Sequence, residues 1–177
     1  MTRRLIGVVV LLVALAGCGG DPKSEPPPSP SPSTTPVSTT PSAPAMPDAA
    51  KENTKAGAIA FVRHYVELIN YAQATGDTSA LAAVEDTGCA SCARGRKYLD
   101  RVYRGGGHVA GGTWTIRTAQ AKSSGENWAV TVVGDFAPSD VFLAANATPK
   151  HADGGPTLTN FVVWNDGNWK VRKWFSG

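Results

Sequence analysis

The sequence contains few of the side chains that metal ions and covalent catalysis require. It has three cysteines and three histidines in 177 residues. The histidines, His64, His108 and His151, lie far apart and show none of the paired spacing that is typical of metal ligands. No Ser-His-Asp arrangement can be read from the sequence either. We therefore predict no metal site, no cofactor and no catalytic residue.

Long apolar runs are also scarce. Residues 5–16 are apolar throughout apart from Gly7. About 12 residues at about 1.5 Å each cover only about 18 Å, less than the roughly 30 Å core of a bilayer. With Arg3 and Arg4 before it, this segment is typical of a signal peptide rather than of a membrane span. No later stretch is long and apolar enough to cross a membrane.

The apolar segment ends in Leu15-Ala16-Gly17-Cys18, which resembles the lipobox of bacterial lipoproteins. In that class a signal peptidase cuts before the cysteine, and the sulfur carries diacylglycerol. The resemblance implies that residues 1–17 are removed and that Cys18 anchors the chain by lipid on the extracytoplasmic face of the cell membrane. The alternative is an ordinary secretory signal with a chance cysteine behind it.

A strong excess of charge is lacking too. Lys and Arg number 17 against 14 Asp and Glu, and removal of Arg3 and Arg4 lowers the 17 to 15. The mature chain then carries a formal charge of about +1. This gives no reason to expect nucleic acid as a partner.

Residues 18–50 have little with which to form a core. Residues 19–48 hold ten of the 13 prolines and no aromatic residue. A segment with so little to bury cannot offset the entropy that ordering costs. We expect a disordered Pro/Ser/Thr-rich tether that spans at most about 90 Å, and its composition also resembles O-glycosylated stalks.

Residues 51–177 are long enough for one domain with a core. The pattern predicts a long helix with Thr54 as N-cap, ended at Gly76, then a short helix around 81–84 and a third helix over 92–104. The long helix carries apolar residues at helical spacing, namely Ala58, Phe61, Val62, Tyr65, Leu68, Ile69 and Ala72.

Strand patterns follow the helices. Alternating residues predict strands over 113–121, 128–136, 157–164 and 168–175, with an Asp-Gly hairpin between the last two. Residues 138–156 read as a loop with room for a short strand at 141–143. Helices followed by antiparallel strands indicate an α+β domain, with N-terminal helices packed on a curved four-stranded sheet. This order resembles the NTF2-like, cystatin-like cone.

A closer resemblance rests on separated motifs. Ala60-Phe61-x-x-x-Tyr65 and Tyr71-Ala72-x-x-Thr75-Gly76-Asp77 are followed by Leu81 and Cys89-x-x-Cys92. Together they resemble a family of actinobacterial lipoproteins of unknown function. The resemblance covers the whole folded domain. It implies a cellular location and a fold but no activity.

Cys89 and Cys92 stand at the junction of the second and third helices. Outside the cytoplasm such a pair is expected to form a disulfide. A thiol–disulfide oxidoreductase is the alternative, because a helix N-terminus lowers a thiol pKa. However, a thioredoxin site follows a buried strand, and here helix and loop precede the motif. Two cysteines alone also make only half a zinc site.

Basic residues gather on one face of the third helix. Arg94, Lys97, Arg101 and Arg104 step by three, four and three. We interpret them as a solvated face, partly neutralised by Asp100 through Arg96 and Arg104. The alternative is a patch for anionic envelope polymers or lipid head groups.

A cone interior offers one candidate pocket, lined by His64, Tyr65 and Asp135. Buried groups of these types serve as general acids and bases when their pKa values are tuned. The plain alternatives are a rim histidine, a packed tyrosine and a strand-end aspartate. We expect a non-enzymatic module that binds an envelope protein or a small hydrophobic ligand. Its open sheet is also suited to forming a homodimer. An enzyme with an acid/base pair in the cone and a redox-active CxxC lipoprotein are the alternatives.

Overall fold

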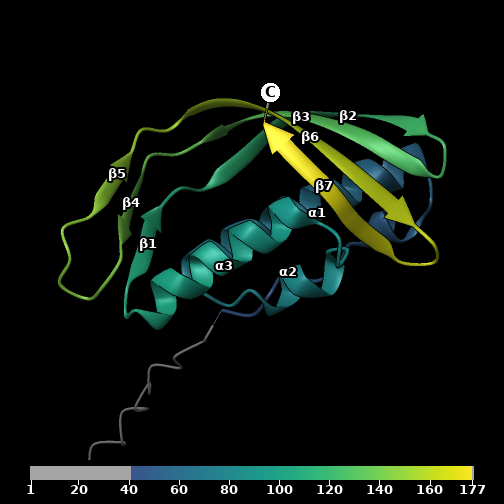
Figure 1. Cartoon of the computed structure of the whole chain (residues 1–177). Coiled ribbons are helices and arrows are strands. Elements are labelled where there is room, and N and C mark those ends of the chain that lie inside the picture. The colour runs from purple at the N-terminus through teal and green to yellow at the C-terminus, as the bar shows by residue number, and fades with distance from the viewer. Residues whose placement is uncertain (1–40, 177) are drawn as a thin grey trace, which may run out of the picture. The chain divides into compact units, whose positions relative to one another are not determined.

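A computed structural model describes residues 41–176 (Figure 1). The predicted signal segment, Cys18 and the tether as far as residue 40 lie outside the described residues. Among residues 41–176, no helix combines the length and the apolar character that a membrane crossing needs.

The long helix α1 (Lys55–Thr75) forms as predicted and is capped at both ends. It follows a short 3-10 turn, η1 (Asp48–Lys51). The Thr54 Oγ1 accepts a hydrogen bond of 3.0 Å from the Gly57 backbone N–H, which satisfies one of the free donors of the first turn. Gly76 ends the helix with φ of 77°, a left-handed conformation that glycine adopts without strain.

Two shorter helices follow. The helix α2 (Ser79–Val84) begins beside Asp77, whose Oδ1 accepts from the Ser79 N–H at 2.9 Å. The helix α3 (Ala90–Arg104) begins two residues earlier than predicted. The reason is its N-cap, because the Cys89 sulfur accepts from the Cys92 N–H at 3.3 Å.

The predicted four-stranded antiparallel sheet is confirmed. It contains β2 (Trp114–Ser124), β3 (Asn127–Phe136), β6 (Gly155–Asn165) and β7 (Trp169–Ser176) in that spatial order. The sheet curves over the helices, as Figure 1 shows. Side chains at every second position of the strands pack with the buried stripe of α1, among them Val130, Val132, Phe161, Val163 and Val171. This is the predicted α+β arrangement of N-terminal helices packed on a curved four-stranded antiparallel sheet.

A second, three-stranded sheet extends the first. It consists of β1 (His108–Gly111), β4 (Ser139–Phe142) and β5 (Lys150–Ala152), in the order β1-β4-β5. The short strand anticipated at 141–143 is β4. The strands β1 and β5 were not predicted, because three or four residues are too few for alternation to show.

The two sheets are joined by a bend that three chain segments share. The strand β1 leads into β2, β3 leads into β4, and β5 leads into β6. Backbone hydrogen bonds continue through the bend, from Gly112 N to Pro138 O at 3.0 Å and from Ala137 N to Thr113 O at 2.9 Å. The β1–β2 and β3–β4 segments therefore stay hydrogen-bonded to each other as they turn.

The helix α1 holds this bend through one side chain. Asn70 Oδ1 accepts from the Trp114 N–H at 2.8 Å, and Asn70 Nδ2 donates to the Trp114 carbonyl at 2.9 Å. Both hydrogen-bonding groups of one backbone residue are satisfied by one amide. The first residue of β2 is thus fixed against the helix.

Candidate functional site

A cavity of about 460 Å³ lies between the helices and the bent part of the sheets. Its walls are mostly apolar. They come from all three α-helices and from strands of both sheets, and they include Ile69, Leu81, Leu99, Val109, Trp114, Phe136 and Val141. The volume lies within the roughly 300–1,000 Å³ of sites that bind small molecules.

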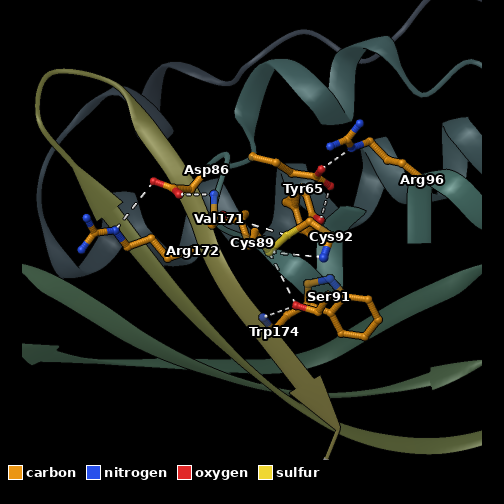
Figure 2. The surroundings of a disulfide bond; sticks show 11 residues. Tyr65, Asp86, Cys89, Ser91, Cys92, Arg96, Val171, Arg172 and Trp174 are labelled. Carbon is orange, nitrogen blue, oxygen red and sulfur yellow. Dashed lines mark hydrogen bonds and ion pairs between the residues drawn. A yellow bond between two sulfur atoms is a disulfide. The ribbon is translucent and has the colours of Figure 1, made fainter. Parts of the chain in front are cut away.

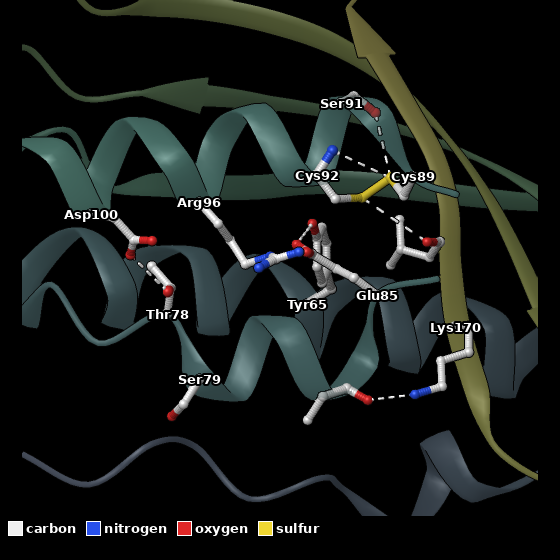
Figure 3. Close-up of polar contacts among 12 residues, drawn as sticks. Tyr65, Thr78, Ser79, Glu85, Cys89, Ser91, Cys92, Arg96, Asp100 and Lys170 are labelled. Carbon is white, nitrogen blue, oxygen red and sulfur yellow. Dashed lines mark hydrogen bonds and ion pairs between the residues drawn. A yellow bond between two sulfur atoms is a disulfide. The ribbon is translucent and has the colours of Figure 1, made fainter. Parts of the chain in front are cut away.

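Three polar residues form a cluster in this mostly apolar wall (Figure 3). The Tyr65 hydroxyl donates to Glu85 Oε1 at 2.7 Å, and Arg96 Nε donates to Glu85 Oε2 at 2.5 Å. All three residues line the cavity, and they come from α1, from the end of α2 and from α3. We call them the Tyr-Glu-Arg cluster.

The main chain places the Glu85 carboxylate. Glu85 forms an isolated parallel bridge with Val171 of β7. The next residue, Asp86, donates its N–H to the Val171 carbonyl at 3.0 Å. The segment after α2 is thereby attached to the sheet, which points Glu85 between the helices.

The electrostatics of the Tyr-Glu-Arg cluster leave it little capacity for acid/base chemistry. Burial, and then the adjacent Glu85 carboxylate, raise the pKa of Tyr65 far above its ordinary value, so its hydroxyl stays protonated and acts as a donor. Each Glu85 oxygen already accepts a hydrogen bond from a neighbour. A buried carboxylate needs such partners to offset its lost hydration. The cluster is therefore better suited to orienting a ligand than to moving protons.

Cys89 and Cys92 form a disulfide next to the cavity (Figure 2). Each cysteine is only 2% exposed. Between them, Ser91 accepts from the Trp174 N–H at 3.2 Å, so this turn is also attached to β7. Each cysteine therefore offers little surface to a thiol from solvent, which favours a structural bond over thiol–disulfide exchange.

The structure places the three residues of the predicted pocket in different surroundings. Tyr65 lines the cavity, whereas His64 and Asp135 do not. Asp135 lies on β3 beside Phe136, and successive side chains of a strand point to opposite faces. Phe136 therefore reaches the cavity, and Asp135 pairs with Arg117 at 3.1 Å instead.

His64 is buried on α1 and is not among the residues that line the cavity. Its Nδ1 has no hydrogen-bond partner among residues 41–176, and the Glu67 carboxylate lies 3.9 Å away. Burial lowers the pKa of His64, which favours the neutral imidazole. Of the three residues predicted to share a pocket, Tyr65 lines this cavity, and His64 and Asp135 do not.

The sequence gives no signal that Glu85 belongs to a site, and it predicts a different partner for Arg96. The sequence predicts that Asp100 pairs with Arg96 and Arg104. Asp100 does lie 3.5 Å from Arg104. However, it accepts from the Thr78 hydroxyl at 3.0 Å and does not pair with Arg96. Arg96 reaches across to α2, and no local spacing signals that contact. Across residues 41–176, no group of three His, Cys, Asp or Glu side chains is arranged to hold a metal ion.

Fold and site together define an α+β domain with an internal, mostly apolar pocket, and the comparisons with known proteins agree with the fold. Residues 30–174 match the family described as "Family of unknown function (DUF6318)". The chain belongs to this family. No curated protein sequence matches the chain.

Two solved structures with low sequence identity are similar to the chain, to different degrees. The intermembrane space region of the chloroplast protein ARC6 is 14% identical, with a TM-score of 0.54, over 71% of this chain and 97% of that one. A putative ketosteroid isomerase from Shewanella frigidimarina is 12% identical, over 64% of this chain and 91% of that one, with a TM-score of 0.35. At 14% identity the likeness to the ARC6 region concerns the fold alone.

The raised pKa of Tyr65 predicts a specific dependence of stability on pH. The folded chain keeps a proton that the unfolded chain loses above the ordinary value of 10.0. The stabilisation is therefore complete below that pH and falls above it, by about 1.4 kcal/mol per pH unit. We expect urea unfolding above pH 10.0 to show this additional slope in the native chain and not in Tyr65→Phe.

Tyr98→Phe, which replaces an exposed tyrosine of α3, is the matched control. It should retain the slope of the native chain. Equal slopes for the native chain and Tyr65→Phe would contradict the assignment of the buried hydroxyl.

The disulfide predicts a measurable loss of stability when both cysteines are replaced. The closed loop is short, so the chain-entropy model gives about 2 kcal/mol for the Cys89→Ala, Cys92→Ala double variant. Because both sulfur atoms are buried, dithiothreitol should reduce the native bond at a rate that rises with urea and follows the unfolded fraction. The double variant, which should not respond to dithiothreitol, is the control. Rapid reduction in native buffer would instead support redox chemistry.

Proposed function

We propose that the chain is a cell-envelope lipoprotein whose extracytoplasmic domain binds a small, largely apolar ligand without transforming it. The observation that carries the proposal is the cavity of about 460 Å³ with its mostly apolar walls. Removal of apolar surface from water drives the binding, at roughly 25 cal/mol per Å² buried. The few polar groups of the wall then fix the orientation of the ligand.

The state of the Tyr-Glu-Arg cluster favours binding over catalysis. A general base must be free to take a proton from the substrate. The carboxylate of Glu85 is 2% exposed and already accepts hydrogen bonds from Tyr65 and Arg96. The cluster is a pre-organised part of the wall, which a binding site needs.

The envelope address is supported by features in three parts of the chain. Leu15-Ala16-Gly17-Cys18 supplies the lipobox pattern, and the proline-rich residues 19–48 supply a tether. The disulfide agrees with an extracytoplasmic position because such bonds persist in oxidising compartments. The tether would hold the cavity within reach of molecules in the envelope.

A substitution at Gly95 tests whether the cavity is the binding site. Gly95 lines the cavity on α3, and a Cβ placed there meets nothing within 4 Å. A phenylalanine would occupy the space, and it is a better helix former than glycine. We expect Gly95→Phe to fold and to lose at least about tenfold in labelling by a diazirine-bearing octanol, with the full chain in phosphatidylcholine nanodiscs.

Gly95→Ala is the matched control for this experiment, because it also removes the helix glycine but leaves the space open. It should be labelled as strongly as the native chain, on peptides from α1 and α3. Equal labelling of Gly95→Phe and the native chain would place the ligand elsewhere.

The lipid anchor is tested separately by metabolic labelling with radioactive palmitate. We expect the label in the native chain and none in Cys18→Ser, because Cys18 is the proposed acceptor. The Cys89→Ala, Cys92→Ala double variant should keep the label. A native chain without palmitate would refute the lipoprotein assignment and leave the cavity proposal unaffected.

A further inference from the structure

We infer that the ligand is a monocarboxylate with an apolar body, whose carboxylate binds the terminal amino groups of Arg96. The inference rests on the proposed binding function and names the chemical class of the ligand. The observation that supports the inference is that the accessible guanidinium of Arg96 lies in a mostly apolar cavity wall.

The guanidinium of Arg96 has hydrogen-bonding capacity to spare. Its Nε donates to Glu85 Oε2 at 2.5 Å. Figure 3 shows the Arg96 and Glu85 side chains pointing toward each other. Within residues 41–176, the two terminal amino groups of Arg96 make no hydrogen bond. A guanidinium presents five donors in a planar fork, and a pair of them matches the two oxygens of a carboxylate. The Nε of Arg96 therefore binds Glu85, and its terminal amino groups are available to a ligand.

Accessibility decides which charge the ligand meets. The Glu85 side chain is 2% exposed, whereas the Arg96 side chain is 30% exposed. Both Glu85 oxygens are also engaged, one by Tyr65 and one by Arg96. An entering ligand therefore reaches the cation and not the carboxylate, although the two charges cancel at a distance. An anionic head group is favoured here, and an ammonium group gains no accessible partner.

The cavity lining contains one further charged residue, Asp153. It neither binds an anionic ligand nor draws a cationic ligand into the cavity. Asp153 lines the cavity at its exposed rim, where its side chain is 98% exposed. His151 Nε2 lies 3.3 Å from Asp153 Oδ1, and His151 Nδ1 lies 2.8 Å from Asp140 Oδ1. The interaction of a ligand with this solvated group is screened, whereas the partly buried Arg96 acts at short range.

The first test compares, on the native chain, competing ligands that differ in their head groups. The full chain in phosphatidylcholine nanodiscs is labelled with a diazirine-bearing octanoate, and unlabelled octanoate, octanol and octylamine compete. The three competitors share one apolar body and differ only in the head group. Charge-assisted hydrogen bonds to a carboxylate predict that octanoate competes at a concentration at least about tenfold lower than the other two, after correction for partition into empty nanodiscs.

Variants of α3 are the second test. Arg96→Gln should bring octanoate to the level of octanol, whereas Arg94→Gln should leave the preference intact. Arg94 is an exposed residue of the same helix and does not line the cavity, so both variants lose the same charge. Because each comparison between variants uses one ligand in the same nanodiscs, partition into the lipid cancels. Circular dichroism checks that Arg96→Gln folds, since Glu85 loses a partner in it.

The outcomes separate the inference from the proposed function. Equal competition by octanoate and octanol on the native chain would overturn the assignment of a carboxylate, and so would a preference for octanoate that persists in folded Arg96→Gln. In either case labelling by the octanol probe would still support the cavity as a binding site. Absence of cavity labelling by both probes would overturn the proposed function itself. The head-group comparison decides the matter even where Arg96→Gln does not fold.

Discussion

The bend that three neighbouring strands share is the constraint on which the cavity depends. Gly111 and Gly112 have φ of 77° and 74°, a region that side chains with a Cβ rarely enter. A Cβ at Gly111 would also lie 2.4 Å from the Pro138 carbonyl oxygen of the adjacent strand. Hydrogen bonds from Gly112 N to Pro138 O and from Ala137 N to Thr113 O keep these backbone groups paired across the bend. The sheet can therefore change direction near the cavity and leave space that its apolar side chains would otherwise fill.

The helix α1 coordinates the core, the cavity and the bend. Phe61 stacks on Trp169 in the core, with 5.5 Å between ring centroids. One turn further Tyr65 reaches the wall of the cavity, and beyond it Asn70 binds the backbone of Trp114. These positions follow one another along a single rigid element. A change in how α1 packs on the sheet would therefore alter the cavity wall and the bend together.

The sequence predicted the parts of the fold that depend on local patterns. The caps at Thr54 and Gly76 and the strands of the main sheet follow from residues close to each other in the chain. The cavity wall depends on contacts between distant residues instead. Glu85 is 20 positions from Tyr65 and 11 from Arg96, so neither helical spacing nor strand alternation relates them.

The placement of Asp135 was within reach of sequence reasoning. Val130 and Val132 point inward, so alternation puts Gly134 and Phe136 on the same inner face and Asp135 on the other. Its partner Arg117 was harder to foresee, because the pairing of β2 with β3 shifts between Ile116 and Thr118.

The face that α3 turns toward the cavity explains how a stable fold can keep a space open. Cys92, Gly95, Arg96 and Leu99 recur at helical spacing, and all of them line the cavity. The disulfide fixes the first turn of the helix, and Arg96 lies one turn beyond Cys92 on the same side. Gly95 beside it removes a side chain from the wall and costs roughly 0.5–1 kcal/mol of helix stability. A helix selected for stability alone would carry a larger residue there, so the glycine agrees with selection for the space next to Arg96.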